Sequence, residues 1–214
     1  MSALVFDLRA EPCELAAGEW APHKRRDPAR LRGVVLHSWA TKVGTAPEAR
    51  RRHGEPLALA RRALAAPYFA SGGLTRSGLG VVALAHPVER YTYASDAGNS
   101  EWLAVSVMGW FPFTEAKRRP QHSLMSDALA EVIAEMLAHA VKHLAEATGH
   151  EGPFPLITHR QCINGAGDHA ACPGEAVVRA ALRSPAVTDG MLVPDPDLVL
   201  VPEWGRAWPA EWRG

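Results

Sequence analysis

The sequence predicts one α/β domain, and three observations support that prediction. A strand over 32–37 is apolar on both faces, as in the interior of a sheet. A long helical pattern covers 123–150. Short runs rich in β-branched or aromatic residues, bounded by turn residues, predict further strands at 80–87, 89–95, 101–110 and 154–159. With 214 residues, 47% of them hydrophobic, the chain is long enough for one substantial core.

The first 80 residues alternate between irregular segments and short elements. Residues 1–30 are expected to form an irregular arm broken by prolines, with one short strand at 3–7. After the 32–37 strand, a helix is expected over 56–65, because Pro56 suits a first helical position. The segment PYFASGGLTRSGLG, at 67–80, is glycine-rich and is interpreted as a turn after Tyr68 and Phe69.

The 123–150 helix is the clearest element, with apolar residues at helical spacing and Gly149 as its stop signal. His139 and His143 are four residues apart on it, which is also a spacing of metal ligands. No glutamate stands beside the first histidine in a metalloprotease-like order, and both histidines lie opposite or beside the apolar stripe. They are therefore interpreted as surface residues.

The last part of the chain contains one more helix and a proline- and tryptophan-rich tail. CPGEAVVRAALRS, at 172–184, predicts a helix with Pro173 in its first position. In the tail, Trp204, Trp208 and Trp212 are spaced by four residues, but Pro209 interrupts the pattern. Packing of the tail onto the domain is favoured over a sugar-binding platform. The expected organisation is an arm at 1–30, a domain at 31–184 and a C-terminal arm at 185–214.

Composition excludes several classes of function. Lys+Arg and Asp+Glu are both 23, so net charge indicates no nucleic-acid partner. The N-terminus lacks a basic region and soon reaches Asp7 and Glu11, so no signal peptide is expected and the protein is predicted to be cytoplasmic as synthesised. No apolar stretch is long enough for a membrane span. We expect a monomer.

The cysteines and two histidines carry the chemistry. Cys13, Cys162 and Cys172 are few and irregularly spaced, which argues against a disulfide scaffold and for a reducing compartment. Two predicted strands end on histidine, at His37 and His159, and Cys172 stands at the mouth of a helix, where a thiolate is favoured.

Two imidazoles and one thiolate would make a three-ligand zinc site, with a fourth position for water or substrate. The alternative is three unrelated residues, with His159 a core histidine and Cys172 a small buried hydrophobe. Spacing alone leaves both interpretations open.

Five segments in order resemble the zinc-dependent N-acetylmuramoyl-L-alanine amidases of the phage-lysozyme type and the related peptidoglycan recognition proteins. LHSWAT resembles their first-ligand segment, and APYFASGG resembles the segment with their active-site tyrosine. SDAGNSEWLAVSVMGW is similar to their Ala-Gly turn and central strand. LITHRQC and ACPGEAV are similar to the segments of their second and third ligands. The resemblance covers roughly residues 30 to 183, and segments in this order are fairly specific.

The resemblance implies a mixed central β-sheet flanked by helices on both faces. It implies Zn²⁺ held by His37, His159 and Cys172, with Tyr68 as a catalytic residue. The substrate would be peptidoglycan or a muropeptide, cleaved between N-acetylmuramic acid and L-alanine. The expected substrate-binding residues are Thr41, Asp96, Asn99 and Asp168.

The chain departs from the family at four positions. Ala170 stands where a lysine or threonine commonly contacts the scissile carbonyl, and Phe69 stands where a histidine usually follows the tyrosine. Asp96 replaces a frequent histidine, and Ser106 takes the place of a glutamate that some relatives use.

The missing lysine or threonine requires another stabilising group. Within the loop NGAGDHAAC, His169 is the expected catalytic replacement, together with Asp168. His169 could instead be an exposed loop residue, and Tyr68 a packing aromatic.

Two alternatives to the amidase remain open. One is a module that binds muropeptides through a degenerate site, and Cys172 argues against it because non-catalytic relatives usually lose this cysteine. The other is a zinc amidase for a different amide, such as a small acylated metabolite.

Overall fold

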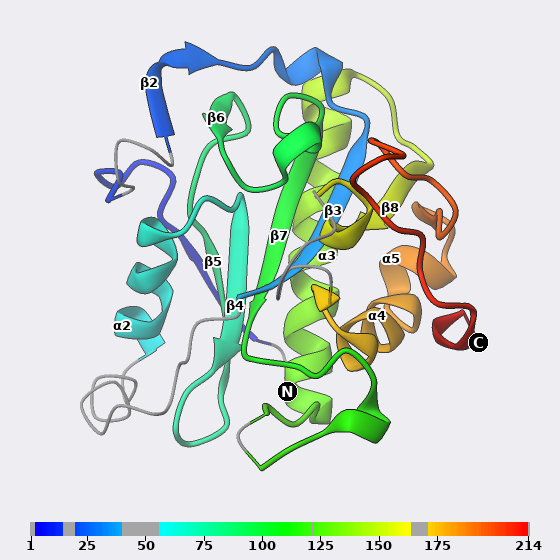
Figure 1. Cartoon of the computed structure of the whole chain (residues 1–214). Coiled ribbons are helices and arrows are strands. Elements are labelled where there is room, and N and C mark those ends of the chain that lie inside the picture. The colour runs from blue at the N-terminus through cyan, green and yellow to red at the C-terminus, as the bar shows by residue number, and fades with distance from the viewer. Residues whose placement is uncertain (1–2, 15–19, 40–55, 121, 164–170, 214) are drawn as a thin grey trace.

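A seven-stranded mixed sheet forms the centre of the computed structural model, which describes residues 3–14, 20–39, 56–120, 122–163 and 171–213 (Figure 1). The strand order is β1-β5-β4-β7-β3-β8-β9, and every neighbouring pair is parallel except β4 with β5. The expected mixed sheet is therefore confirmed. The strands of this sheet are β1 (Leu4–Asp7), β3 (Gly33–Trp39), β4 (Ala70–Leu74), β5 (Gly80–Leu84), β7 (Trp102–Met108), β8 (Phe154–Thr158) and β9 (Leu192–Pro194).

Helices cover both faces of the sheet, as predicted. On β5, Val82 and Leu84 join the core under the long helix α3, while Val81 and Ala83 pack with the residues of α2 on the opposite face. The short helices α4 and α5 pack beside α3, on the same face of the sheet. The helices are α2 (Pro56–Arg61), α3 (Asp127–Thr148), α4 (Glu175–Leu182) and α5 (Pro185–Thr188). The 3-10 turns are η1 (Pro28–Arg30), η2 (Arg62–Ala65), η3 (Asp96–Gly98), η4 (Glu115–Lys117), η5 (His159–Gln161) and η7 (Ala210–Trp212).

Helix α3 is capped at both ends, and Gly149 is the stop signal that the sequence predicts. The Ser126 side chain accepts a hydrogen bond from the backbone N–H of Leu129, which satisfies one of the helix's unpaired N-terminal donors. Gly149 ends the helix in the left-handed region at φ 76°. The apolar stripe between these caps faces the sheet and is buried.

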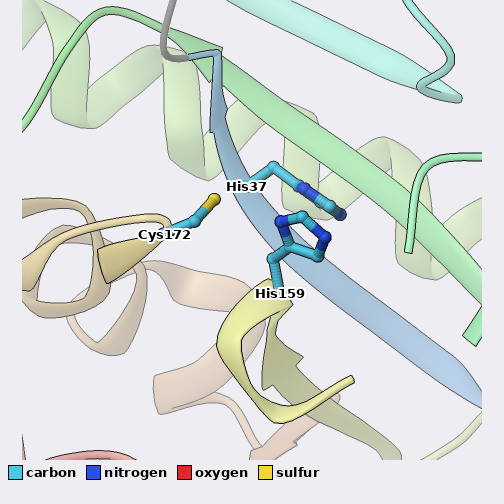
Figure 2. A group of neighbouring side chains, drawn as sticks. All are labelled: His37, His159 and Cys172. Atoms are coloured by element: carbon cyan, nitrogen blue, oxygen red, sulfur yellow. The ribbon is translucent and has the colours of Figure 1, made fainter. Parts of the chain in front are cut away.

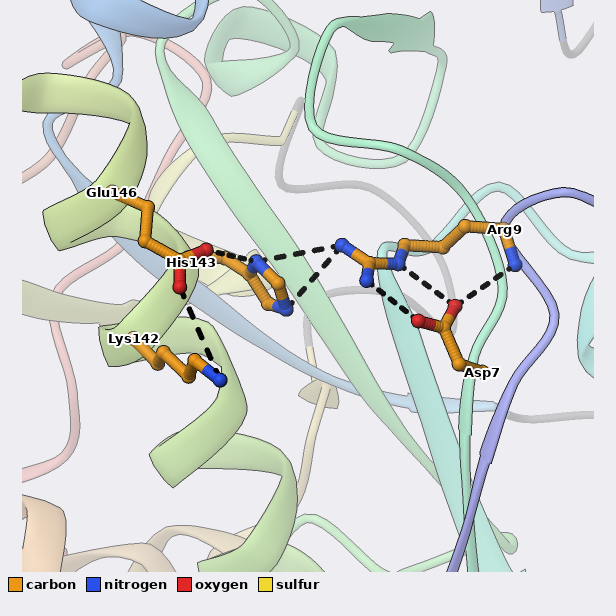
Figure 3. A network of polar contacts seen from close by, with 5 residues as sticks. All are labelled: Asp7, Arg9, Lys142, His143 and Glu146. Carbon is orange, nitrogen blue, oxygen red and sulfur yellow. Dashed lines mark hydrogen bonds and ion pairs between the residues drawn. The ribbon is translucent and has the colours of Figure 1, made fainter.

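The interpretation of His143 as a surface residue is wrong. Its side chain is buried, and its ring meets the edge of the Phe69 ring at a centroid distance of 5.3 Å. Arg9 Nη1 lies 3.4 Å from both ring nitrogens, and Glu146 lies 2.9 Å from Nδ1 (Figure 3). Asp7 binds the same guanidinium, so this network fastens the segment after β1 to α3. Arg9 and Phe69 come from distant segments, which helical periodicity does not reveal.

The interpretation of 67–80 as a turn is also wrong, because the segment contains β4, which pairs with β5 and β7. A Cβ atom at Gly72 would lie 2.4 Å from Val132 Cγ1 of α3. The glycine is therefore needed for the helix to approach the sheet closely. Gly72, which the sequence suggests as part of a turn, is instead a strand residue that allows close packing of α3.

Short strands near both ends of the described chain add to this architecture. β1 pairs with β5, and β9, which was not predicted, pairs with β8. The unpredicted strand β2 (Trp20–Arg25) pairs with β6 (Arg90–Thr92) in a separate two-stranded antiparallel sheet. The 89–95 prediction was therefore too long.

Two tryptophans of the C-terminal tail are buried against neighbouring residues. Trp208 and Trp212 are buried, with Val178 of α4 and Phe113 around them, while Trp204 is exposed. Cys13, Cys162 and Cys172 form no disulfide. Among the described helices, none has the length and apolar character that crossing a membrane requires.

Candidate metal centre

His37 projects from the interior strand β3, which lies between β7 and β8, onto the face of the sheet opposite α3. Val34 and Leu36 belong to the α3 core, so the alternating residues Val35 and His37 point the other way. The imidazole is buried, with 1% of its surface exposed. The strand continues two residues beyond His37 to Trp39, so the prediction that it ends at His37 was short.

His159 follows the neighbouring strand β8 directly, in the turn η5. Because β8 runs parallel to β3, with Thr158 opposite Leu36, the two histidines emerge side by side. Their ring centroids are 4.2 Å apart. The prediction that a strand delivers His159 is confirmed.

Gln161 fixes the turn that carries His159. Its Oε1 accepts hydrogen bonds from Thr158 N at 2.6 Å and Thr158 Oγ1 at 3.0 Å, and also from Trp208 Nε1. Its Nε2 donates to the carbonyl oxygens of Asp195 and Leu198. The turn is therefore tied to the C-terminal segment 195–208.

Cys172 lies against the strand that carries His37. Its Sγ accepts a hydrogen bond from the backbone N–H of Ser38 at 3.3 Å. Helix α4 begins at Glu175 after the N-cap Gly174, so the expectation that Pro173 opens the helix is wrong. Burial raises the pKa of the Cys172 thiol to about 11, and the hydrogen bonds from Ser38 oppose that rise. The expectation of a helix-stabilised thiolate is wrong as well, and a bound cation is what would displace the proton.

The three residues form the one group of at least three potential metal ligands found in the described part of the chain. One donor atom each from His37, His159 and Cys172 lies within 4.8 Å of the other two. Figure 2 shows the sulfur and the two rings turned toward one another. Tetrahedral zinc with ordinary bond lengths places such donors about 3.3–3.6 Å apart. Small side-chain movements would close that difference, so the donor set and spacing fit a zinc ion.

Tyr68 lies beside the cluster, with its ring centroid 4.9 Å from that of His37. It precedes β4, and its backbone N–H donates to the Ala66 carbonyl. The same carbonyl lies 2.8 Å from Nε2 of His86, and His86 Nδ1 lies 2.7 Å from Arg90 Nη1. Because Arg90 can only donate, His86 Nδ1 accepts and Nε2 carries the proton. Burial lowers the pKa of His86 to about 4, with a smaller contribution from Arg90.

The turn around η3 supplies a polar neighbour to His37 that the sequence did not indicate. Ser95 Oγ lies 3.2 Å from His37 Nε2, and both residues are buried. Asn99, expected to bind substrate, uses its Oδ1 to accept from the Ser95 N–H at 2.7 Å. Asp96 is exposed in the same turn, with φ 44°. The structure thus places Asp96 and Asn99 near His37 through Ser95.

Several expected site residues lie outside the described residues: Thr41, Asp168 and His169, together with the departure at Ala170. Ser106, at the position of the glutamate found in some relatives, is the Cα partner of His37 on β7 and is fully buried. Sequence reasoning missed Ser38, Ser95 and His86. Ser38 adjoins a predicted ligand, whereas Ser95 and His86 carried no local signal of their contacts.

Comparison with known proteins reveals a shared fold. No protein-family model matches the chain, and no curated protein matches it by sequence. Among solved structures, Drosophila PGRP-LB matches with a TM-score of 0.50 and 14% identity, over 86% of this chain and 95% of that one. This protein has the fold of a peptidoglycan recognition protein.

Two further solved structures are similar at lower scores. Staphylococcus aureus hydrolase AmiA has a TM-score of 0.49 and 10% identity, over 89% of this chain and 82% of that one. The Ph2119 endolysin of a Thermus scotoductus bacteriophage has a TM-score of 0.44 and 15% identity, over 83% and 98%. At these identities the comparisons concern the fold alone.

Proposed function

We propose that this protein is a zinc-dependent amidase that hydrolyses the bond between N-acetylmuramic acid and L-alanine in peptidoglycan. The observation that carries the proposal is the convergence of His37, His159 and Cys172 from three separate elements. Three protein ligands, rather than four, are typical of catalytic zinc. The recognition-protein fold supports peptidoglycan as the substrate class.

Each residue has a distinct part in this mechanism. Zinc held by the two imidazoles and the Cys172 thiolate would act as a Lewis acid. It would also lower the pKa of a bound water toward neutral pH. The Ser38 N–H stabilises the Cys172 sulfur as an anion. The Tyr68 hydroxyl donates a hydrogen bond to the oxyanion that develops on the scissile carbonyl, because its ring lies against His37. His169 and Asp168 remain proposed contributors from the loop before Cys172.

A muropeptide-binding module without turnover is the second candidate. The observation that favours it is Ser106, because a serine hydroxyl cannot replace the carboxylate that some relatives use as a general base. The two functions differ in whether an amide bond is broken. They share the substrate and the fold.

Digestion of purified sacculi separates these functions. Mass spectrometry of the soluble fraction should find free stem peptides, while the glycan strands stay intact. New reducing sugar ends would mean glycosidase action instead. Sacculi that retain the protein without releasing peptide would favour the binding module.

A zinc-loaded protein that neither binds nor digests sacculi would favour another amide, to be sought in a panel of acylated metabolites. Cys172→Ala serves as the inactive control throughout.

A further inference from the structure

We infer that Ser95 is a positioning residue that holds the His37 ring with Nε2–H toward its hydroxyl and Nδ1 toward the metal, an inference that rests on the proposed zinc site. Ser95 Oγ lies 3.2 Å from His37 Nε2, and 1% of each residue is exposed. When the hydroxyl accepts a hydrogen bond from Nε2–H, the lone pair of the imidazole lies on Nδ1. Nδ1 is then the atom that faces the ion.

The arrangement has the form that metal centres commonly use. A histidine ligand usually donates its second ring N–H to a neighbouring acceptor, which fixes the ring orientation and makes the ligand nitrogen more basic. Carboxylates and carbonyls are the frequent acceptors, and here a buried hydroxyl takes that place. Because the contact is sheltered from water, water does not readily replace a lost hydroxyl.

Ser95 is itself held by two further residues. Asn99 Oδ1 accepts the Ser95 N–H at 2.7 Å, and the Ser95 carbonyl accepts from Gly98 N at 2.8 Å. The guanidinium of Arg26 is buried and donates from Nη1 to the carbonyls of Asn99 and Trp102. These bonds fix the turn on the sheet, so the hydroxyl has a defined position relative to the ring. Asn99 accordingly supports the site and need not contact substrate.

Ser106 provides a matched control on the strand beside His37. It is the Cα partner of His37 on β7, it is fully buried, and its Oγ has no hydrogen-bond partner among the described residues. Ser95→Ala and Ser106→Ala therefore remove the same hydroxyl from equally buried neighbours of His37. Only the first removes a contact to the ring.

The test measures zinc affinity by competition with a chromogenic chelator, and the His37 tautomer by ¹⁵N NMR of the imidazoles. Ser95→Ala should weaken zinc binding about ten- to a hundred-fold. It should also shift the metal-free His37 signals away from the Nε2–H pattern. Ser106→Ala should keep both properties of the wild type, and Ser95→Thr, which retains a hydroxyl, should recover most of the affinity. Thermal unfolding of the metal-free variants checks that each one folds.

The outcomes separate this inference from the proposed function. If the wild type binds zinc and Ser95→Ala binds it equally well with unchanged ¹⁵N shifts, the role of Ser95 is overturned and the zinc site stands. Equal losses of zinc affinity in Ser95→Ala and Ser106→Ala would also overturn it. The loss would then follow from removing any buried hydroxyl near His37, whether or not it contacts the ring. A wild type that binds no zinc would overturn both the inference and the proposed amidase.

Discussion

The sulfur of Cys172 lies 3.3 Å from the backbone nitrogen of Ser38, the residue that follows His37. Two segments far apart in the chain therefore meet at one peptide group. The contact places the thiol beside the first imidazole without any disulfide or ion pair. It also makes the position of Cys172 depend on β3, which is among the most buried parts of the molecule.

Replacement of Cys172 by alanine should remove most of the metal. The purified wild type should hold about one zinc per chain, and the variant only a small fraction of it, because two histidines alone bind zinc weakly. Elemental analysis after dialysis measures this. Cys162→Ala is the matched control, since that thiol is also buried but lies outside the cluster. Full zinc content in Cys172→Ala would remove the cysteine from the site.

Replacement of Tyr68 by phenylalanine should lower turnover about a hundred- to a thousand-fold while zinc content stays unchanged. The ring and its packing on His37 are kept, and only the hydroxyl is lost. Release of stem peptides from sacculi gives the rate. Tyr93→Phe, at an exposed tyrosine, should have the wild-type rate. A wild-type rate in Tyr68→Phe would assign oxyanion stabilisation elsewhere, with His169→Ala as the next variant.

The buried imidazole of His86 should make stability depend on pH. Its pKa is lowered from 6.5 to about 4 in the folded protein, so between these values the unfolded chain binds more protons. The contribution of neutral His86 to the free energy of unfolding is complete above pH 6.5 and is lost as the pH falls toward 4. Its full size is on the order of 3 kcal/mol. Urea unfolding between pH 7 and 5 should show a shallower decline for His86→Gln than for the wild type, and equal declines would contradict the prediction.

A methyl group at Gly72 should destabilise the fold by about 1–3 kcal/mol, because α3 packs directly on this position. The added Cβ would lie 2.4 Å from Val132 Cγ1. Urea unfolding of Gly72→Ala measures the loss. Truncation of the opposing residue in Gly72→Ala/Val132→Ala should recover part of it, and a double-mutant cycle tests this coupling. Strictly additive effects would show that the two positions do not clash.

The parts of the fold that could be predicted are those in which local pattern and tertiary environment agree. Helix α3 is predicted by its apolar residues at helical spacing and by Gly149. The apolar runs of β3 and β8 predict buried strands. β4 was missed because its glycines serve close packing. β9 has only three residues, and the sequence of β2, WAPHKR, contains a proline and basic residues in place of an apolar alternation.

The candidate site shows the same division. The strand-borne histidines and Cys172 could be found from their order and from the family resemblance. The Ser95 contact could not, because it depends on how a turn folds back over β3. The pKa of Cys172 was misjudged for a related reason, since burial of the thiol outweighs the hydrogen bonds from Ser38.

In the proposed zinc site, the hydrogen bonds of Gln161 would link the lifetime of a bound ion to the segment 195–208. Residues 195–208 hold the turn of His159 through the Asp195 and Leu198 carbonyls and the Trp208 indole. Local opening of that segment releases several bonds on this turn at once, so the turn and the segment behave as one cooperative unit. Amide hydrogen exchange in the segment and dissociation of the ion should then share a rate. Proteolysis within this segment would then cause loss of the ion, although no metal ligand is cut or altered.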